Sequence, residues 1–165
     1  EVLPDGSGSR VAMFSARFDG GEVELQIRAV HRLLLRHNYE VRMVEAGAGD
    51  DFGDDTLLFL DEIKSNDGVM LAVCTAHYAE MTASKFSSYV ELKYCFANGV
   101  QVLPLRMVDT YPPTPPYGSE HAYDQKGKAK ALIGAAFAPS LLYLDCRGKT
   151  VEEIASQIAA RLRRS

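Results

Sequence analysis

Short apolar segments alternate with amphipathic ones along this chain, a pattern typical of a parallel sheet covered by helices. Strands are predicted over residues 10–15, 40–44, 68–74, 100–105 and 141–145. The third of these, GVMLAVC, is apolar throughout, which indicates a central strand buried on both faces.

Helices are predicted where apolar residues recur at helical spacing between the strands. They cover residues 23–34, a short stretch that begins at Asp54 and Asp55, residues 84–98, residues 126–136 and the segment after Thr150. Gly99 is suited to end the third helix, and Thr150 is suited to cap the last one. The proline-rich residues 111–118 fit neither element and predict an exposed, partly extended loop.

Five strands joined by right-handed crossovers favour a flavodoxin-like α/β fold, a doubly wound five-stranded parallel sheet in the order 2-1-3-4-5 with helices on both faces. Ligands of such sheets bind at the carboxyl ends of the strands, where the order reverses between the first strand and the third. The candidate site residues therefore fall within residues 15–19, 45–55 and 75–91.

Length and composition predict one domain. The chain has 165 residues, of which 47% are hydrophobic, enough for one sizeable core. Residues 1–9 are polar and predict a flexible linker, which leaves residues 10–165 as the domain.

Charge and hydrophobicity argue against two classes of partner. The formal net charge of -4 argues against binding to nucleic acid, and no apolar run approaches the roughly 20 residues that cross a membrane. Three cysteines without C-x-x-C spacing favour a reducing, cytoplasmic setting over a disulfide framework or a zinc site.

The loop of residues 47–55 is rich in glycine and aspartate. Its spacing, G-x-G-x-x-x-G, differs from the dinucleotide-binding fingerprint, and its aspartates would repel a pyrophosphate. The same aspartates follow no recognised metal-binding pattern, so no metal is expected. A flexible loop is the better interpretation.

Histidine and cysteine indicate little chemistry. The four histidines are scattered, and none shares a spacing with a carboxylate or cysteine that suggests a ligand set or a triad. His77, just past the third strand, fits an ordinary loop residue better than a ligand contact. Cys74 ends that strand and fits a buried, inert thiol better than a nucleophile.

Two charged residues remain as candidates. Arg17 follows the first strand, where its guanidinium is equally suited to a phosphate or carboxylate ligand and to a surface ion pair. Glu91 lies on the third predicted helix with Ser84 and Ser88 at helical spacing, and we expect it to be partly exposed. From spacing alone, a helix-stabilising role for Glu91 is favoured over a chemical one.

Three segments resemble successive motifs of a TIR (Toll/interleukin receptor-like) domain of the enzymatic, NAD-cleaving type. They are VAMFSARF at 11–18, FGDDTLLFLDEIKSNDGVMLAVCTAHY at 52–78 and SSYVELKYCFANGVQVLPL at 87–105. Glu91 falls where enzymatic TIR domains carry a glutamate, eight residues before Gly99.

The resemblance covers most of residues 10–110. Ser87 and Ser88 stand where relatives often carry an aromatic residue and a cysteine, and the proline-rich residues 111–118 have no counterpart that we can assign. The departures concern the surroundings of the base pocket and not the position of Glu91.

The resemblance implies an NAD+ glycohydrolase, which cleaves the bond between nicotinamide and ribose to give ADP-ribose or a cyclic ADP-ribose, in immune or stress signalling. NAD+ or a related nucleotide is then a substrate, and no bound cofactor is implied. Glu91 would be the ribose-facing carboxylate, and Arg17 would hold the phosphates. The other binding residues that the resemblance implies are Ser15, Ser84 and Ser88, with the rings of Phe14, Phe18 or Tyr78.

The resemblance also implies association with other TIR domains, as a homo-oligomer when active. The loop of residues 47–55, whose glycines allow a change of shape, would complete the site of a neighbouring copy. Two other functions stay open. One is a non-catalytic scaffold for signalling, and the other is a nucleoside deoxyribosyltransferase-like enzyme, which shares the sheet architecture and uses a glutamate on N-glycosidic bonds.

Overall fold

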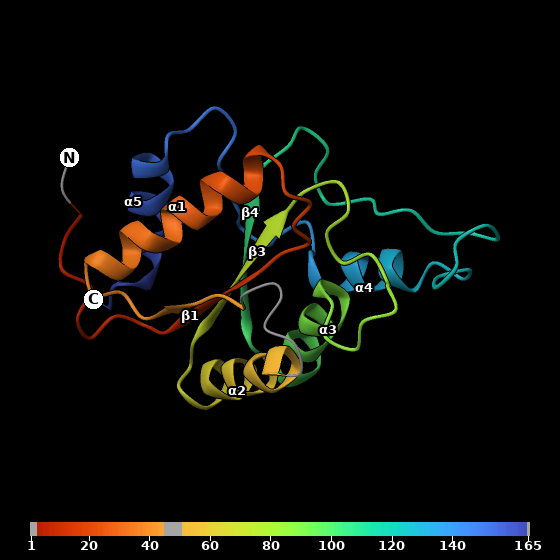
Figure 1. The fold of residues 1–165 in the computed structure, drawn as a ribbon, viewed down its shortest axis with the longest axis horizontal. Helices are drawn as coiled ribbons and strands as arrows, with labels where there is room; N and C mark the ends of the chain where they lie inside the picture. Colours follow the sequence, from red (N-terminus) through yellow and green to blue (C-terminus); the bar gives the residue numbers. More distant parts are fainter. Residues whose placement is uncertain (1–2, 45–50, 165) are drawn as a thin grey trace.

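The computed structural model describes residues 3–44 and 51–164. They include the strands of a five-stranded sheet and the helices that cover it (Figure 1). The strands are β1 (Ala12–Ser15), β2 (Val41–Arg42), β3 (Val69–Cys74), β4 (Gln101–Arg106) and β5 (Leu144–Asp145). All neighbouring strands are parallel, and their order is β2-β1-β3-β4-β5. The predicted flavodoxin-like α/β fold and its 2-1-3-4-5 order are confirmed.

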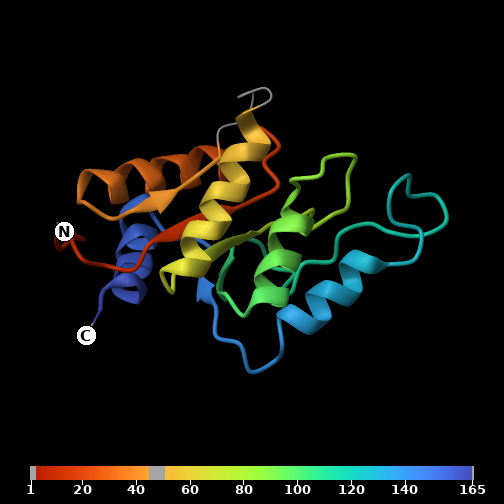
Figure 2. The same cartoon turned by 90° about the horizontal axis from the view of Figure 1, so that it is seen from below.

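Helices cover both faces of the sheet (Figure 1, Figure 2). On one face lie α1 (Glu22–Arg36) and α5 (Val151–Leu162). On the other lie α2 (Asp51–Ser65), α3 (Ser88–Asn98) and α4 (Lys128–Ala136). No helix in the described residues combines the length and the hydrophobicity needed to cross a membrane.

The central strand β3 is buried on both faces, as its apolar sequence predicts. Successive side chains of a strand point to opposite faces, so β3 contributes to two separate cores. Leu71 and Val73 pack into the core beneath α1 and α5. Met70 and Ala72 pack into the core beneath α2, α3 and α4.

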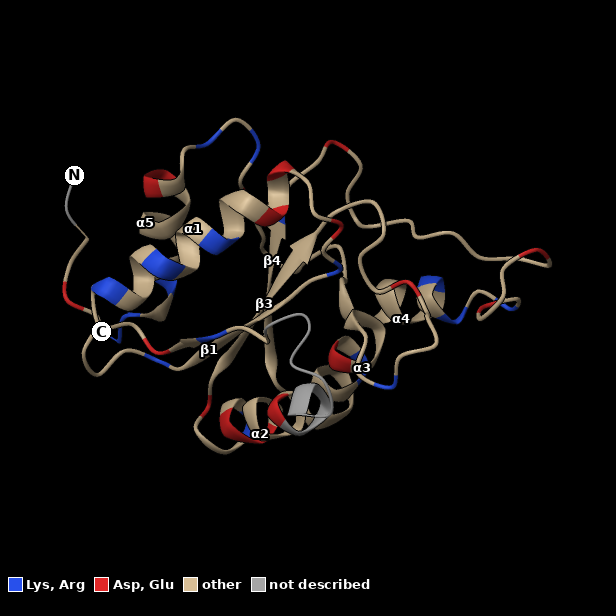
Figure 3. Cartoon of the chain, viewed as in Figure 1, with Lys and Arg blue, Asp and Glu red and all other residues tan. Residues whose placement is uncertain are grey.

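Local sequence signals account for several helix ends. Thr150 caps α5, because its hydroxyl accepts from the Glu153 amide at 3.1 Å while the Glu153 carboxylate accepts from the Thr150 amide at 2.9 Å. Gly99 follows α3 in the left-handed region, with φ of 66°. In α1 the first turn is acidic and Arg36 lies in the last turn, a charge order that favours the helix dipole (Figure 3).

Two helix predictions are wrong. α2 has 15 residues and is not short. α3 begins at Ser88 and not at residue 84, because Ser87 has extended backbone and the Ser84 hydroxyl accepts locally from the Phe86 amide at 3.1 Å. Ser84 therefore precedes the helix that carries Ser88 and Glu91.

Residues 3–9, for which the sequence predicts a flexible linker, lie against the domain. Leu3 is buried in the core beneath α1 and α5. The Gly6 amide donates to the His37 carbonyl at 2.7 Å, and Gly6 packs against the ring of Tyr39. These contacts depend on residues distant in sequence.

Residues 111–118 contain no helix or strand, as expected. Pro113 and Pro115 are nevertheless buried, so the expectation of an exposed loop is wrong for these two. The ring of Tyr111 stacks on those of Phe137 and Tyr143, with centroids 6.2 and 4.4 Å away, and this packing holds the segment against the domain.

Packing requires glycine at position 68, just before β3. A Cβ there would lie 2.7 Å from the Val11 carbonyl oxygen and 2.9 Å from Ile63 Cα, both backbone atoms. We expect Gly68→Ala to lower the free energy of unfolding by about 1–3 kcal/mol in chemical denaturation. Gly134→Ala is the matched control, because its Cβ would meet nothing within 4 Å and alanine favours a helix by about 0.5–1 kcal/mol. Equal stability of the two variants would contradict this account of Gly68.

Candidate functional site

A cleft of about 260 Å³ opens at the carboxyl ends of β1 and β2. Residues 16–18 after β1 and residues 43–44 after β2 contribute to its lining. Arg28 of α1, the loop before α3 and the first turn of α3, which carries Glu91, complete it. The cleft thus lies beside β1, at the edge where the strand order reverses and where ligands of doubly wound sheets bind.

Glu91 is buried in this cleft, with 5% of its surface exposed. The Ser15 hydroxyl donates to Glu91 Oε1 at 2.6 Å. Glu91 Oε2 has no hydrogen-bond partner in the described part of the chain. In that part of the chain, Gln157 Oε1 is the only side-chain oxygen or nitrogen that is both fully buried and without a partner, so Glu91 Oε2 is not fully buried. Glu91 Oε2 therefore keeps contact with solvent, on the side of the cleft.

Burial governs the acidity of Glu91. Removal from water raises its pKa to about 8, although the Ser15 hydrogen bond acts to lower it. The expectation of a partly exposed Glu91 is wrong, because the first turn of α3 packs against the end of β1 and turns this side chain inward. At neutral pH the free protein therefore holds Glu91 mainly in its protonated form.

Ser15 and Tyr78 support Glu91 and do not line the cleft. Both residues are fully buried. The Tyr78 hydroxyl lies 3.0 Å from Ser15 Oγ, and because Ser15 gives its own proton to Glu91, Tyr78 is the donor. The predicted roles of Ser15 as a ligand contact and of Tyr78 as a ring-packing residue are therefore wrong, since neither side chain has surface to offer a ligand.

Two guanidinium groups reach the cleft. Arg17, which the sequence identified, pairs with Glu80 at 3.3 Å and keeps 40% of its side chain exposed. The expected surface ion pair of Arg17 is therefore present, and its contact with the phosphate or carboxylate of a ligand stays a prediction.

Arg28 is a cleft residue that sequence reasoning missed. It pairs with Glu24 at 2.9 Å and lies over the ring of Phe18, 5.1 Å from its centroid. Apolar spacing gave no signal for it, because Arg28 follows Ile27 of the apolar stripe by one position and therefore points to a different side of the first helix.

The other predicted binding residues, Phe14, Phe18, Ser84 and Ser88, do line the cleft. Phe14 is buried and Phe18 is half-buried, so Phe18 offers more surface to a ligand. The Ser88 hydroxyl is already engaged, since it accepts from the Ala79 amide at 2.8 Å.

Two of the four histidines, His77 and His121, pair with the same carboxylate, an arrangement that the sequence analysis did not predict. His77 Nδ1 lies 2.7 Å from Glu80 Oε1, and His121 Nε2 lies 2.9 Å from Glu80 Oε2. The first pair is visible in the sequence as a spacing of three, whereas the second joins distant loops. The prediction of a buried Cys74 is confirmed, and burial raises the pKa of its thiol.

Among the side chains that the structure describes, those of residues 3–44 and 55–164, no three His, Cys, Asp or Glu come together in a way that would hold a metal ion. The prediction of a flexible loop over residues 47–55 is wrong for residues 51–55, which form the start of α2, and residues 47–50 lie outside the described residues.

Comparison with models of protein families and with curated proteins finds no match to this chain.

Proposed function

We propose that this protein cleaves the bond between nicotinamide and ribose in NAD+ or a related nucleotide, with Glu91 as the carboxylate beside the ribose. One observation carries the proposal. A buried carboxyl, held by Ser15, keeps one oxygen open to a cleft at the carboxyl ends of the strands. The resemblance of VAMFSARF and SSYVELKYCFANGVQVLPL to motifs of NAD-cleaving TIR domains supports the same residue.

This reaction requires few protein groups. Nicotinamide leaves a cationic substrate as a neutral base, so no acid is needed, and positive charge builds up on the ribose as the bond breaks. An anionic carboxylate stabilises that charge. Because a neighbouring cation favours the ionised form of a carboxyl, binding of NAD+ is expected to release the Glu91 proton. Capture of the ribose by water gives ADP-ribose, and internal capture gives a cyclic product.

The remaining cleft residues suit the rest of a dinucleotide. Arg17 offers guanidinium donors for the diphosphate, Arg28 adds a second positive charge to the lining, and Phe18 offers a ring for packing. The cleft of about 260 Å³ is smaller than the roughly 300–1,000 Å³ of sites that enclose a whole ligand, so it fits one end of the substrate. Completion of the site by a neighbouring copy in a homo-oligomer agrees with this size.

A nucleoside deoxyribosyltransferase-like activity is the second candidate, because the pKa of Glu91 is raised to about 8. A neutral base leaves more readily when an acid protonates it, and a carboxyl that is protonated at neutral pH can supply the proton. Base release from deoxynucleosides would then fall as the pH rises through about 8, whereas cleavage of NAD+ by the Glu91 anion would rise.

The test is the release of nicotinamide from NAD+ and of free base from deoxynucleosides by the purified protein, from about pH 6 to 9 and over a series of protein concentrations. We expect nicotinamide release that increases through about pH 8, with turnover per molecule that increases as copies associate. Base release from deoxynucleosides alone would favour the second candidate. Cleavage of neither substrate at any concentration would leave the non-catalytic scaffold as the interpretation.

A further inference from the structure

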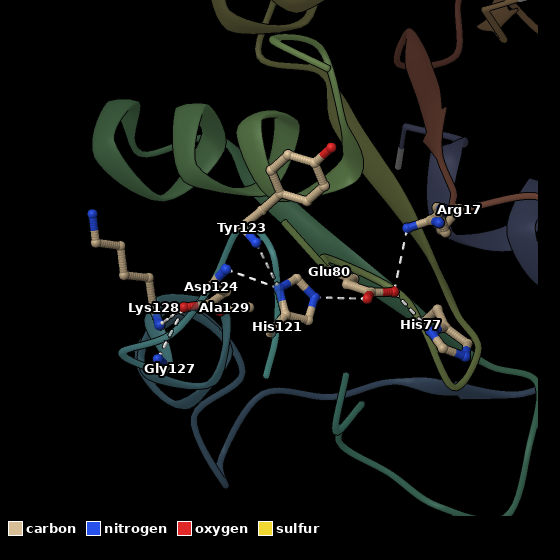
Figure 4. Close-up of polar contacts among 9 residues, drawn as sticks. All are labelled: Arg17, His77, Glu80, His121, Tyr123, Asp124, Gly127, Lys128 and Ala129. Carbon is tan, nitrogen blue, oxygen red and sulfur yellow. Dashed lines mark hydrogen bonds and ion pairs between the residues drawn. The ribbon is translucent and has the colours of Figure 1, made fainter. Parts of the chain in front are cut away.

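Glu80 lies beside Arg17 but outside the cleft lining, and both of its carboxylate oxygens are engaged (Figure 4). Oε1 accepts from Arg17 at 3.3 Å and lies 2.7 Å from His77 Nδ1, while Oε2 lies 2.9 Å from His121 Nε2. Although burial acts to raise the pKa of Glu80, the hydrogen bonds with His121 and His77 outweigh it and lower the pKa. Glu80 is therefore an anion at neutral pH, held from both sides.

His121 is the firmer of the two histidine contacts. Its Nδ1 accepts from the Tyr123 and Asp124 amides at 3.0 and 2.8 Å. Two donors at Nδ1 leave the ring proton on Nε2, which therefore donates to Glu80. His121 is 11% exposed and His77 is 57% exposed, so solvent competes much less with the contact from His121.

The network continues from His121 to α4 (Figure 4). The Asp124 carboxylate accepts from the amides of Gly127, Lys128 and Ala129 at 2.9, 2.7 and 3.0 Å. These hydrogen bonds hold residues 121–129 together around the first turn of α4. Among the contacts that Figure 4 draws, only the one from the His121 ring connects this segment to Glu80.

The backbone also directs Glu80. Ala79 has a φ of 67°, in the left-handed region that an alanine adopts only when its surroundings require it. The Ser88 hydroxyl accepts from the Ala79 amide at 2.8 Å, which ties this turn to the start of α3, the helix that carries Glu91. Glu80 therefore lies between α3, which carries the candidate catalytic residue Glu91, and residues 121–129.

We propose that Glu80 is a positioning residue for Arg17, and that His121 holds Glu80 in place, so that residues 121–129 control how Arg17 meets a phosphate in the cleft. The inference rests on the proposed function only in taking a nucleotide diphosphate as the ligand. Glu80 contacts one nitrogen of the guanidinium, and Arg17 has no other hydrogen bond within the described residues. The other N–H groups of Arg17 thus stay available for a phosphate while the side chain is held.

The experiment is a double-mutant cycle on the binding of ADP-ribose, measured by calorimetry. We expect His121→Ala to weaken binding about fivefold. In protein that already carries Arg17→Ala, the same change should have no effect on Kd, because His121 acts through Arg17. The matched control is His37→Ala, at the carboxyl end of α1 and outside this network, which should leave Kd unchanged in both backgrounds.

Equal effects of His121→Ala with and without Arg17 would overturn the inference, as would a parent protein that does not bind ADP-ribose. If melting shows that His121→Ala does not fold, Glu80→Gln takes its place in the cycle, and its effect on Kd must likewise disappear with Arg17→Ala. Nicotinamide release separates the two proposals. If the effect of His121→Ala on Kd depends on Arg17 but the protein does not cleave NAD+, this inference is supported and the proposed function is wrong. If the protein cleaves NAD+ but the effect does not depend on Arg17, the proposed function is supported and this inference is wrong.

Discussion

Glu91→Gln is expected to lower the rate of nicotinamide release by about 10²- to 10³-fold. Glutamine keeps the size of the side chain and still accepts a hydrogen bond from Ser15, but it cannot carry the negative charge. The lost contribution is the stabilisation of positive charge on the ribose. The measurement is kcat/KM for NAD+ near pH 7 and near pH 9. The loss should be larger near pH 9, because Glu91 of the free parent, with a pKa of about 8, is more fully ionised there.

Glu152→Gln is the control for this experiment. Glu152 is an exposed glutamate in the first turn of α5, away from the cleft lining, so the same chemical change there should leave kcat/KM unaltered. If Glu91→Gln is folded and cleaves NAD+ as well as the parent at both pH values, Glu91 has no catalytic role.

The same substitution should stabilise the protein at alkaline pH. Glu91 has a folded-state pKa of about 8 against 4.5 for an unburied glutamate, so between these values the folded state holds a proton that the unfolded state has released. Stability of the parent therefore falls as the pH rises, by up to about 1.4 kcal/mol per pH unit from this residue. Glutamine does not titrate. We expect the Tm of Glu91→Gln to exceed that of the parent by about 5–10 °C near pH 8.

The comparison of melting curves needs a low-pH reference. Below about pH 4.5 both states of the parent hold the proton, so the gap in Tm between parent and Glu91→Gln should close. Glu152→Gln, which makes the same chemical change at an exposed position, is again the matched control. A gap in Tm that stays constant from acid to alkaline pH would mean that Glu91 is not held as a buried acid.

The elements of the fold could be predicted because each depends on neighbouring residues. The unbroken apolar run of β3 indicates a strand buried on both faces, Gly99 ends α3 because it adopts left-handed backbone, and Thr150 caps α5 with Glu153 three residues away. The order of the strands followed from the alternation of strands and helices together with the handedness of crossovers.

Glu91 is an intermediate case. Its position at the cleft was predicted from a resemblance in sequence, but its spacing on the helix favoured a surface role. Burial of Glu91 requires contact between α3 and β1, and the hydrogen bond that holds it comes from Ser15, which is 76 residues away along the chain. The spacing of residues within α3 therefore does not indicate that Glu91 is buried or that Ser15 is its partner.

The network around Glu80 shows what only the tertiary structure decides. His121 lies 41 residues from Glu80 and Arg17 lies 63 residues from it, and these partners meet because parallel strands bring the loops at their carboxyl ends together. Apolar periodicity and turn residues determine strands, helices and their order, since these arise from short-range geometry. The pairing of particular charges across separate loops depends on how the chain packs in three dimensions, and the spacing of residues along the sequence does not record it.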